Sequence, residues 1–230
     1  MFSTDNLAAR IDHTLLKPDA TRAQIEQLCS EAVAAGFASV CVPPHYVPVA
    51  AAALHSSGVA VCTVIGFPLG YNTPAAKQAE AEEALRHGAT ELDMVLNNAA
   101  FRSGDFAAVQ RDIQQLADIC HHQGALLKVI IETALLTPED IAKACELCAA
   151  AGADFVKTST GFASRGASVE DVRLMRSQLP AHIRIKAAGG IRTHAQAVAL
   201  VQAGADRLGA SAGLALLTLD NDAAHEPTAY

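Results

Sequence analysis

The sequence lacks an excess of basic residues, because 17 Lys and Arg stand against 24 Asp and Glu, for a formal net charge of −7. This balance argues against nucleic acid or an anionic membrane as a general partner. The chain also lacks an apolar run of the ~18–20 residues that a bilayer span needs. Its first ten residues lack the basic and then apolar pattern of a signal peptide. We therefore expect a cytoplasmic protein.

The spacing of a small disulfide scaffold is absent as well. The six cysteines lie mostly in apolar or helical segments, so we expect reduced thiols. The one close pair, Cys145 and Cys148, falls inside an expected helix and has no partner pair. No grouping of His, Asp and Glu shows the spacing of metal ligands, which predicts that the protein holds no metal.

What the sequence does contain is a repeated unit, in which a helix ends at Gly and an apolar strand begins within a few residues. Gly is favoured just past a helix because it adopts a positive φ without a Cβ clash. Several stretches between the strands carry helix start signals, such as Thr21-x-x-Gln24 and the pairs Thr73-Pro74 and Thr137-Pro138. Strands are expected near residues 11–14, 38–42, 59–65, 91–97, 125–131, 154–159, 182–187 and 206–210.

Strands that alternate with helices indicate parallel βαβ units. Eight of them in a chain of 230 residues predict a closed (β/α)₈ TIM barrel of the α/β class, formed as a single domain by residues 1–219. The polar segment 220–230 is expected to be a tail. The alternative is an open doubly wound sheet, which usually shows a glycine-rich loop after its first strand, and residues 11–20 (IDHTLLKPDA) contain none.

Side chains alternate along a strand, and several of these strands have one purely apolar face, which suits packing against helices. The other face carries charge and should point into the barrel. Lys128, in mid-strand, is interpreted as a member of a structural ion-pair network. Lys157 and Lys186 lie at the carboxyl ends of their strands, where such barrels carry active sites. The charged residues expected inside are Asp93, Lys128, Glu132, Lys157, Arg184 and Lys186.

Two neighbouring lysines suggest a specific chemistry. Adjacent strands are ~4.8 Å apart, so the two ammonium groups should approach to about 6 Å and repel each other by roughly 3 kcal/mol. This corresponds to a pKa lowered by about two units. One lysine, Lys157 or Lys186, is then neutral often enough to attack a carbonyl and form a Schiff base, with Asp93 and the second lysine moving protons.

Two glycine-bearing turns follow the last two strands. Residues 189–192 (GGIR) lead into a helix capped by Thr193, and residues 209–213 (GASAG) lead into the last helix. Backbone N–H groups at helix N-termini bind anions, and these two loops form the usual phosphate site of such barrels. The residues therefore indicate a Schiff-base enzyme acting on a small phosphorylated carbonyl compound.

Eight segments along the chain carry a resemblance to a known family: IDHTLLKP (11–18), VCVPP (40–44), GFPLG (66–70), ELDMVLN (91–97), LKVIIET (127–133), FVKTSTGF (155–162), IKAAGGIRT (185–193) and GASAG (209–213). Through these segments the sequence resembles the class I deoxyribose-phosphate aldolase family along nearly its full length. The resemblance implies reversible cleavage of 2-deoxy-D-ribose 5-phosphate to acetaldehyde and D-glyceraldehyde 3-phosphate, a role in deoxynucleoside catabolism, and no metal or organic cofactor. The phosphorylated sugar and the aldehydes are then the partners.

The resemblance assigns roles to individual residues. It implies that Lys157 forms the Schiff base, that Lys186 perturbs it and moves protons, and that Asp93 is the acid/base carboxylate. It implies that Asp12, at the end of the first strand, helps to bind or relay. The implied substrate and phosphate positions are Thr160, Gly161, Gly189, Gly190, Arg192, Gly209 and Ser211.

Three positions raise further questions. Phe162 stands where some family members carry a basic residue, and our hypothesis is that Arg165 or Arg192 compensates. A terminal tyrosine assists proton transfer in some members, so Tyr230 is a candidate beside the plainer reading of a free tail. Cys41, near the end of the second strand, is interpreted as a core residue with pocket lining as the alternative.

Several alternatives remain open at this stage. A transaldolase-like or keto-acid lyase would use the same lysine with a different donor. A phosphate-binding isomerase, or a non-catalytic barrel that binds sugar phosphates, would need no covalent lysine. Both alternatives are disfavoured, because neither function gives a reason to keep two lysines that repel each other inside the barrel. The alanine-rich helices either cover the barrel or form a homodimer face.

Overall fold

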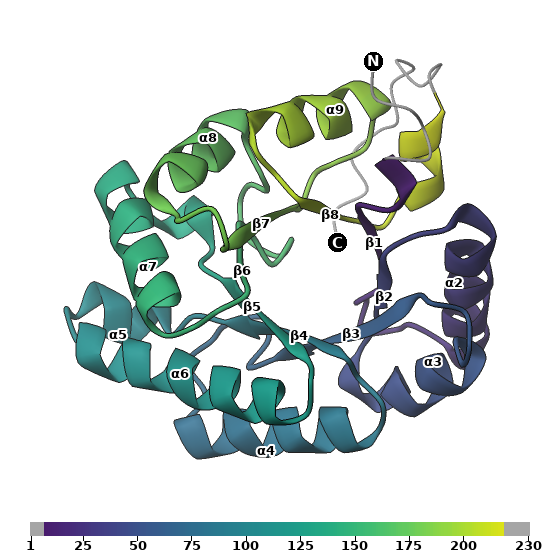
Figure 1. The fold of residues 1–230 in the computed structure, drawn as a ribbon, viewed down its shortest axis with the longest axis horizontal. Coiled ribbons are helices and arrows are strands. Elements are labelled where there is room, and N and C mark those ends of the chain that lie inside the picture. Colours follow the sequence, from purple (N-terminus) through teal and green to yellow (C-terminus); the bar gives the residue numbers. More distant parts are fainter. Residues whose placement is uncertain (1–6, 219–230) are drawn as a thin grey trace.

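The computed structural model describes residues 7–218. Within them, parallel strands close into a barrel in the order β1 to β8, with helices around the outside (Figure 1). This confirms the (β/α)₈ fold and makes the open-sheet alternative wrong. Residues 220–230, including Tyr230, lie outside the described residues. The strands are β1 Ile11–Thr14, β2 Ser39–Cys41, β3 Ala60–Ile65, β4 Glu91–Val95, β5 Leu126–Ile130, β6 Phe155–Lys157, β7 Arg184–Ala188 and β8 Arg207–Ala210.

The helices begin where the start signals predicted. Thr21 and Gln24 form a reciprocal capping box at α2, and Thr73 and Thr137 cap α4 and α7, each followed by Pro. These caps satisfy backbone N–H groups that have no partner within the helix. The helices are α2 Arg22–Ala35, α3 Val47–Ala53, α4 Pro74–Arg86, α5 Asn98–Arg102, α6 Phe106–His122, α7 Pro138–Ala150, α8 Val169–Gln178 and α9 His194–Ala203, with 3₁₀ turns η1 Pro44–Tyr46, η2 Thr133–Leu135 and η3 Gly213–Leu217.

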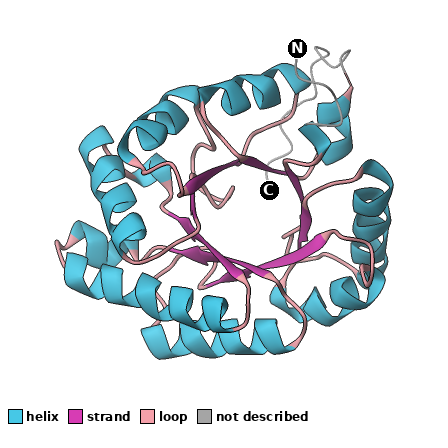
Figure 2. Cartoon of the chain, in the orientation of Figure 1, coloured by secondary structure: helices cyan, strands magenta, loops and turns pink. Residues whose placement is uncertain are grey.

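The main apolar core lies between the barrel and the ring of helices that surrounds it in Figure 2. Strand residues that alternate with the charged positions, such as Leu92, Met94, Leu127 and Val129, are fully buried in this core. The barrel interior is different, because it holds charged side chains. This is the division between an apolar outer face and a mixed inner face that the alternation predicted. Among residues 7–218, no helix combines the length and the apolar character that crossing a membrane requires.

Candidate active site

The pairing of the strands places four of the predicted charged residues on the inner face of the barrel. Lys157 on β6 pairs directly with Lys186 on β7, and Asp93 on β4 pairs with Lys128 on β5. Directly paired residues of parallel strands point to the same face and lie ~4.8 Å apart. The register therefore gathers three lysines and one aspartate inside the barrel.

Asp93 lies at the centre of this cluster and is fully buried. Its Oδ1 accepts a hydrogen bond from Lys128 Nζ at 2.8 Å, and its Oδ2 accepts one from Lys157 Nζ and one from Lys186 Nζ, each at 2.8 Å. Burial acts to raise the pKa of Asp93, but the three ammonium groups outweigh it and hold this pKa well below the usual range. The carboxylate is therefore ionised and bridges the lysines.

The three lysines differ in their partners. Lys186 contacts the carboxylates of Asp12 and Asp93, and its side chain is fully buried. Lys128 contacts the carboxylates of Glu91 and Asp93, and its side chain is fully buried as well. For Lys157, Asp93 is the carboxylate partner within the described part of the chain, and the side chain keeps 4% exposure. Among the described residues, Lys157 thus has one carboxylate partner where each of the other two lysines has two.

The structure overturns one expectation about Lys186. Repulsion between the two lysines was expected to lower a lysine pKa, but the pKa of Lys186 is raised. Burial acts to lower this pKa, and the nearby carboxylates of Asp12 and Asp93 more than reverse the effect. Asp93 lies between the two ammonium groups, so their charges are screened by an anion rather than left to repel each other.

Asp12 lies deeper than expected. It is not the last residue of β1, which ends at Thr14, and it is fully buried. It accepts from Lys186 and from Arg207 on β8, and Arg207 also contacts Glu91 at 3.1 Å. Burial acts to raise the pKa of Asp12, and the charges of Lys186 and Arg207 bring it below the usual range. Sequence reasoning missed Arg207 and Glu91, although both occupy inward positions of their strands.

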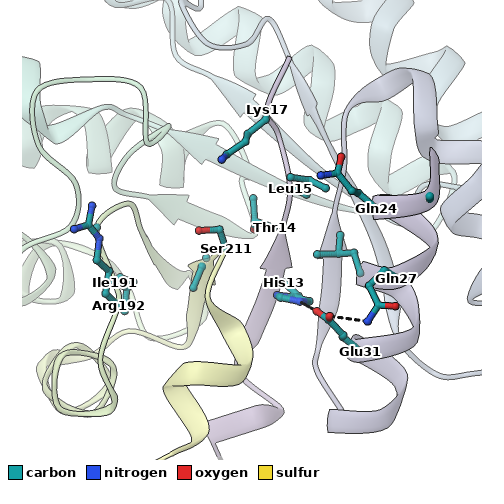
Figure 3. A pocket seen from close by; sticks show the side chains of 15 residues that line it. His13, Thr14, Leu15, Lys17, Gln24, Gln27, Glu31, Ile191, Arg192 and Ser211 are labelled. Atoms are coloured by element: carbon teal, nitrogen blue, oxygen red, sulfur yellow. Dashed lines mark hydrogen bonds and ion pairs between the residues drawn. The ribbon is translucent and has the colours of Figure 1, made fainter. Parts of the chain in front are cut away.

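The glycine loops form a separate cavity of about 530 Å³ at the carboxyl ends of β1, β7 and β8. Four of the predicted phosphate residues line it: Gly190, Arg192, Gly209 and Ser211. Figure 3 shows Lys17 and Thr14 of the first strand and its loop on the opposite side of the cavity from Arg192. Lys17 was missed by the sequence reasoning, although it lies within the quoted segment IDHTLLKP.

Gly189 and Gly161 pack against each other beside this cavity. A Cβ at Gly189 would lie 3.0 Å from the Cα of Gly166 and 3.5 Å from the Cα of Gly161. Gly189 also has φ of 87°, a conformation that side chains disfavour. These glycines bring the β6 and β7 loops into close backbone contact.

Thr160 points away from the glycine loops. Its hydroxyl donates to Glu132 Oε2 at 2.5 Å, and its backbone N–H donates to the same atom at 3.1 Å. Glu132 was expected on a strand facing the barrel interior, but β5 ends at Ile130 and Glu132 has φ of 57°. This left-handed turn directs the carboxylate to the loop after β6. Glu132 is therefore a support of that loop.

Arg165 does not take the place of a basic residue at position 162. Its guanidinium contacts Asp171 and donates to the Thr133 carbonyl at 2.8 Å, and it is not among the residues that line the glycine-loop cavity. Phe162 is 42% exposed and packs edge-to-face on Phe67. The cations that line the cavity are Lys17 and Arg192.

Two further residues singled out in the sequence, Arg184 and Cys41, are not among the residues that line the glycine-loop cavity. Arg184 lies over the ring of Phe155, 4.0 Å from its centroid, beside a cavity at the amino-terminal end of the barrel. Cys41 is fully buried, and its pKa is lowered, first by its hydrogen bond with Cys62 and then by the charge of Lys186, against the effect of burial. Cys41 thus belongs to the lining of the lysine cluster rather than to the outer core.

Comparison with known proteins decides the family. The model of the DeoC/LacD family of aldolases matches residues 7–218. This chain belongs to that family. Relatives named deoxyribose-phosphate aldolase are 55% identical in Exiguobacterium sibiricum, over 93% of this chain and 96% of the relative, and 51% identical in Thermococcus gammatolerans, over 92% and 95%. The DeoC/LacD members are aldolases and so lyases, which sets aside the isomerase and non-catalytic readings.

Solved structures agree with this family. The aldolase QR15 has a TM-score of 0.88 and 42% identity, covering 92% of this chain and 94% of its own. A deoxyribose phosphate aldolase from Aeropyrum pernix, described as a unique tetramer, has a TM-score of 0.88 and 38% identity, covering 94% and 91%. An orotidine 5′-phosphate decarboxylase from Pyrococcus horikoshii, at 16% identity and a TM-score of 0.63, shares the barrel fold.

Proposed function

We propose that this DeoC/LacD family member cleaves 2-deoxy-D-ribose 5-phosphate reversibly to acetaldehyde and D-glyceraldehyde 3-phosphate through a Schiff base on Lys157. The observation that carries the proposal is the difference between the lysines. Lys186 and Lys128 each contact two carboxylates and are fully buried, whereas Lys157 contacts Asp93 and keeps slight exposure. Lys157 is therefore the lysine that a substrate can reach.

The resting ion pair supplies the first proton transfer. Lys157 Nζ lies 2.8 Å from Asp93 Oδ2, so this oxygen is placed to relay a Lys157 proton to the substrate carbonyl oxygen as the substrate approaches. The neutral amine then attacks C1, the carbonyl oxygen takes up protons and leaves as water, and a protonated imine remains. This cation draws the electrons of the C2–C3 bond as that bond breaks.

The same carboxylate then serves the remaining proton transfers. The C3 hydroxyl loses its proton as glyceraldehyde 3-phosphate departs, and C2 of the enamine takes a proton before water releases acetaldehyde. Asp93 Oδ2 is the acid/base group nearest to Lys157, and Lys186 Nζ, at 2.8 Å from the same oxygen, stabilises its negative charge. Proton transfer by a positioned group of this kind contributes ~10²–10⁴-fold to a rate.

The phosphate group is assigned to the glycine-loop cavity. Lys17 and Arg192 line it together with Ser211 and the backbone of Gly190 and Gly209. Two cations, a hydroxyl and backbone N–H groups suit a phosphate dianion. Lys17 is then the basic residue that compensates for Phe162 at the phosphate site. Arg165 does not supply this positive charge, because it is engaged with Asp171.

Three further expectations stay predictions. These are the cytoplasmic location, a homodimer and the absence of a metal or organic cofactor. The tetramer of the Aeropyrum pernix relative makes self-association worth measuring by light scattering.

A turnover assay tests the function. Purified full-length protein is supplied with 2-deoxyribose 5-phosphate, and the release of glyceraldehyde 3-phosphate is followed. We expect turnover by the wild type and none above the uncatalysed rate in Lys157→Met. Lys143→Met is the matched control, because Lys143 is a partly exposed lysine that pairs with Glu146 on α7, and it should keep full activity. Turnover with a different donor but none with acetaldehyde would instead support the transaldolase-like alternative.

A further inference from the structure

Two cysteines face each other inside the barrel, next to the lysine cluster. Cys41 on β2 is the direct register partner of Cys62 on β3. Both are fully buried. Their sulfur atoms and a carboxylate oxygen of Asp93 lie within 4.8 Å of one another. Neither the proposed reaction nor the packing of the outer core uses this pair.

The geometry is compatible with a disulfide. Directly paired residues of parallel strands lie ~4.8 Å apart, which falls within the range of about 4.4–6.8 Å between the Cα atoms of bonded cysteines. Both side chains point to the same face because they occupy matched positions. Small movements of two sulfur atoms, rather than of the strands, would therefore bring them into bonding distance.

A metal ion is not the natural occupant of this cluster. Asp93, the one carboxylate that could complete a metal site with Cys41 and Cys62, already accepts from Lys128 through Oδ1 and from two further lysines through Oδ2. A divalent cation placed there would face three ammonium groups at short range. The pair is thus better suited to thiol chemistry than to metal binding.

The two thiols have complementary properties. The pKa of Cys41 is lowered, first by its hydrogen bond with Cys62 and further by the ammonium groups of Lys186 and Lys157, against the effect of burial. The pKa of Cys62 is raised, chiefly by burial, and its thiol donates to Asp93 Oδ1 at 3.2 Å. A thiol that ionises more readily beside one that ionises less readily is an arrangement that favours disulfide formation.

The other cysteines lack these features. Burial raises the pKa of Cys145 to about 12 and that of Cys29 to about 11. Cys145 and Cys148 are close in sequence, but both lie within α7 with raised pKa values. Cys41 therefore stands apart as the thiol that an oxidant would attack.

We propose that Cys41 and Cys62 are a redox modification site, at which a hydroperoxide converts the two thiols into a reversible disulfide that switches off the lysine cluster. The site lies beneath two loop side chains, Leu16 and Phe67, that are only partly buried. A small peroxide that follows the substrate's route to Lys157 can reach it. The disulfide itself is independent of the proposed function, whereas its effect on turnover rests on it.

The reaction balances with one hydroperoxide and two thiols. The Cys41 thiolate attacks a peroxide oxygen, the O–O bond breaks, and the departing oxygen takes a proton to leave as water or an alcohol. Cys41 is then a sulfenic acid. Cys62 sulfur attacks the Cys41 sulfur, the S–O bond breaks, and the hydroxide leaves as water with the proton that Cys62 had shared with Asp93. The thiols are oxidised by two electrons and the peroxide is reduced.

The disulfide would disturb the lysine cluster directly. Cys62 donates to Asp93 and accepts from Lys128 Nζ at 3.4 Å. A sulfur–sulfur bond of about 2.05 Å draws Cys62 towards Cys41 and removes its S–H donor. Asp93 then loses a hydrogen bond and Lys128 loses an acceptor. We expect turnover to fall by about ten-fold, as for the loss of a hydrogen bond to a charged group.

The test treats the full-length wild type with hydrogen peroxide, removes the peroxide, unfolds the protein in guanidinium chloride, blocks the remaining thiols with N-ethylmaleimide and measures the intact mass. We expect four labelled thiols instead of the six present in the sequence and a loss of two hydrogen atoms. Chymotrypsin cleaves after Phe37 and Tyr46, which separates Cys41 from Cys62 unless a disulfide joins the peptides. Dithiothreitol should restore both the thiols and the turnover.

Matched variants make the result specific. Cys145→Ser removes a buried thiol of the outer helix α7, and this variant should still form the disulfide and lose turnover reversibly. Cys41→Ser should not form it. The proposal is overturned if all six thiols persist, if the bond joins Cys145 to Cys148, if Cys41 gains oxygen without pairing, or if turnover is unchanged in protein shown to carry the disulfide. The peptide map of the wild type decides the matter even where a variant does not fold.

Discussion

Lys157 and Lys186 donate hydrogen bonds to one and the same atom, Oδ2 of Asp93, each across 2.8 Å. The two lysines are direct partners in the register of β6 and β7, so the oxygen lies where both side chains converge. One lysine is held by a second carboxylate, Asp12, and the other is not. This asymmetry assigns different tasks to two residues that look equivalent in the sequence.

Lys186→Met should reduce turnover while leaving Lys157 in place. The ammonium of Lys186 stabilises the negative charge on Asp93 during proton transfer, so its loss should lower kcat by about 10²–10⁴-fold. Initial rates of 2-deoxyribose 5-phosphate cleavage measure the effect, and circular dichroism verifies the fold. A variant that is folded and retains wild-type kcat would show that Lys186 has only a structural role.

Lys128→Met should act mainly on stability. Lys128 is fully buried between Glu91 and Asp93, and removing one partner of such a network leaves buried carboxylates undercompensated. We expect the free energy of unfolding to fall by about 3–5 kcal/mol, measured by urea denaturation, and kcat to fall less than in Lys186→Met. If stability is unchanged while kcat collapses, the structural interpretation of Lys128 is wrong.

Lys17→Ala should weaken the binding of phosphorylated substrate. Lys17 lines the glycine-loop cavity, and a hydrogen bond from a charged group contributes about 1.5–3 kcal/mol, so the KM for 2-deoxyribose 5-phosphate should rise by about ten-fold or more with a similar kcat. Unphosphorylated 2-deoxyribose should be affected little. Arg165→Ala is the matched control, since Arg165 is engaged with Asp171, and an equal rise in KM there would contradict this assignment.

Folding stability should depend on pH in two separate windows. The pKa values of Asp93 and Asp12 lie below their ordinary value of 3.8, so the ionised carboxylates stabilise the fold above about pH 4 and this contribution is lost as the pH falls further. Burial acts to lower the pKa of Lys186, but nearby carboxylates raise it above 10.5, so its contribution is complete below that pH and is lost above it.

Urea unfolding across pH measures both windows. We expect a decline of the free energy of unfolding below about pH 4 and another above about pH 10.5, with no change due to these groups between the two windows, where their contribution is complete. A stability that stays constant from about pH 4 down to about pH 2 would mean that these carboxylates are not held ionised by the lysines.

The sequence predicted the parts of the fold that follow from local pattern. Strand alternation placed Asp93, Lys157 and Lys186 on one inner face, and Thr21 and Thr137 marked where helices begin. These inferences succeeded because side-chain alternation and capping depend on neighbours along the chain.

The sequence-based predictions that were wrong or incomplete concern features that depend on contacts between distant segments of the chain. The expected repulsion between Lys157 and Lys186 considered two charges and omitted Asp93, whose place between them follows from the closed barrel. Glu132 was placed on a strand because the left-handed turn after Ile130 leaves no mark in an apolar run. Lys17 was missed because the path of a loop decides which cavity its residues line.

The direct test of the central claim is to trap the Schiff base. Full-length protein is incubated with acetaldehyde and sodium borohydride, and the modified residue is located by peptide mapping. The account predicts an N-ethyl group on Lys157, which blocks tryptic cleavage there. The variant Lys157→Leu should gain no such group. Lys186, held between two carboxylates, should remain unmodified. A folded protein that gains no adduct, or gains it on Lys186 instead, would contradict the account.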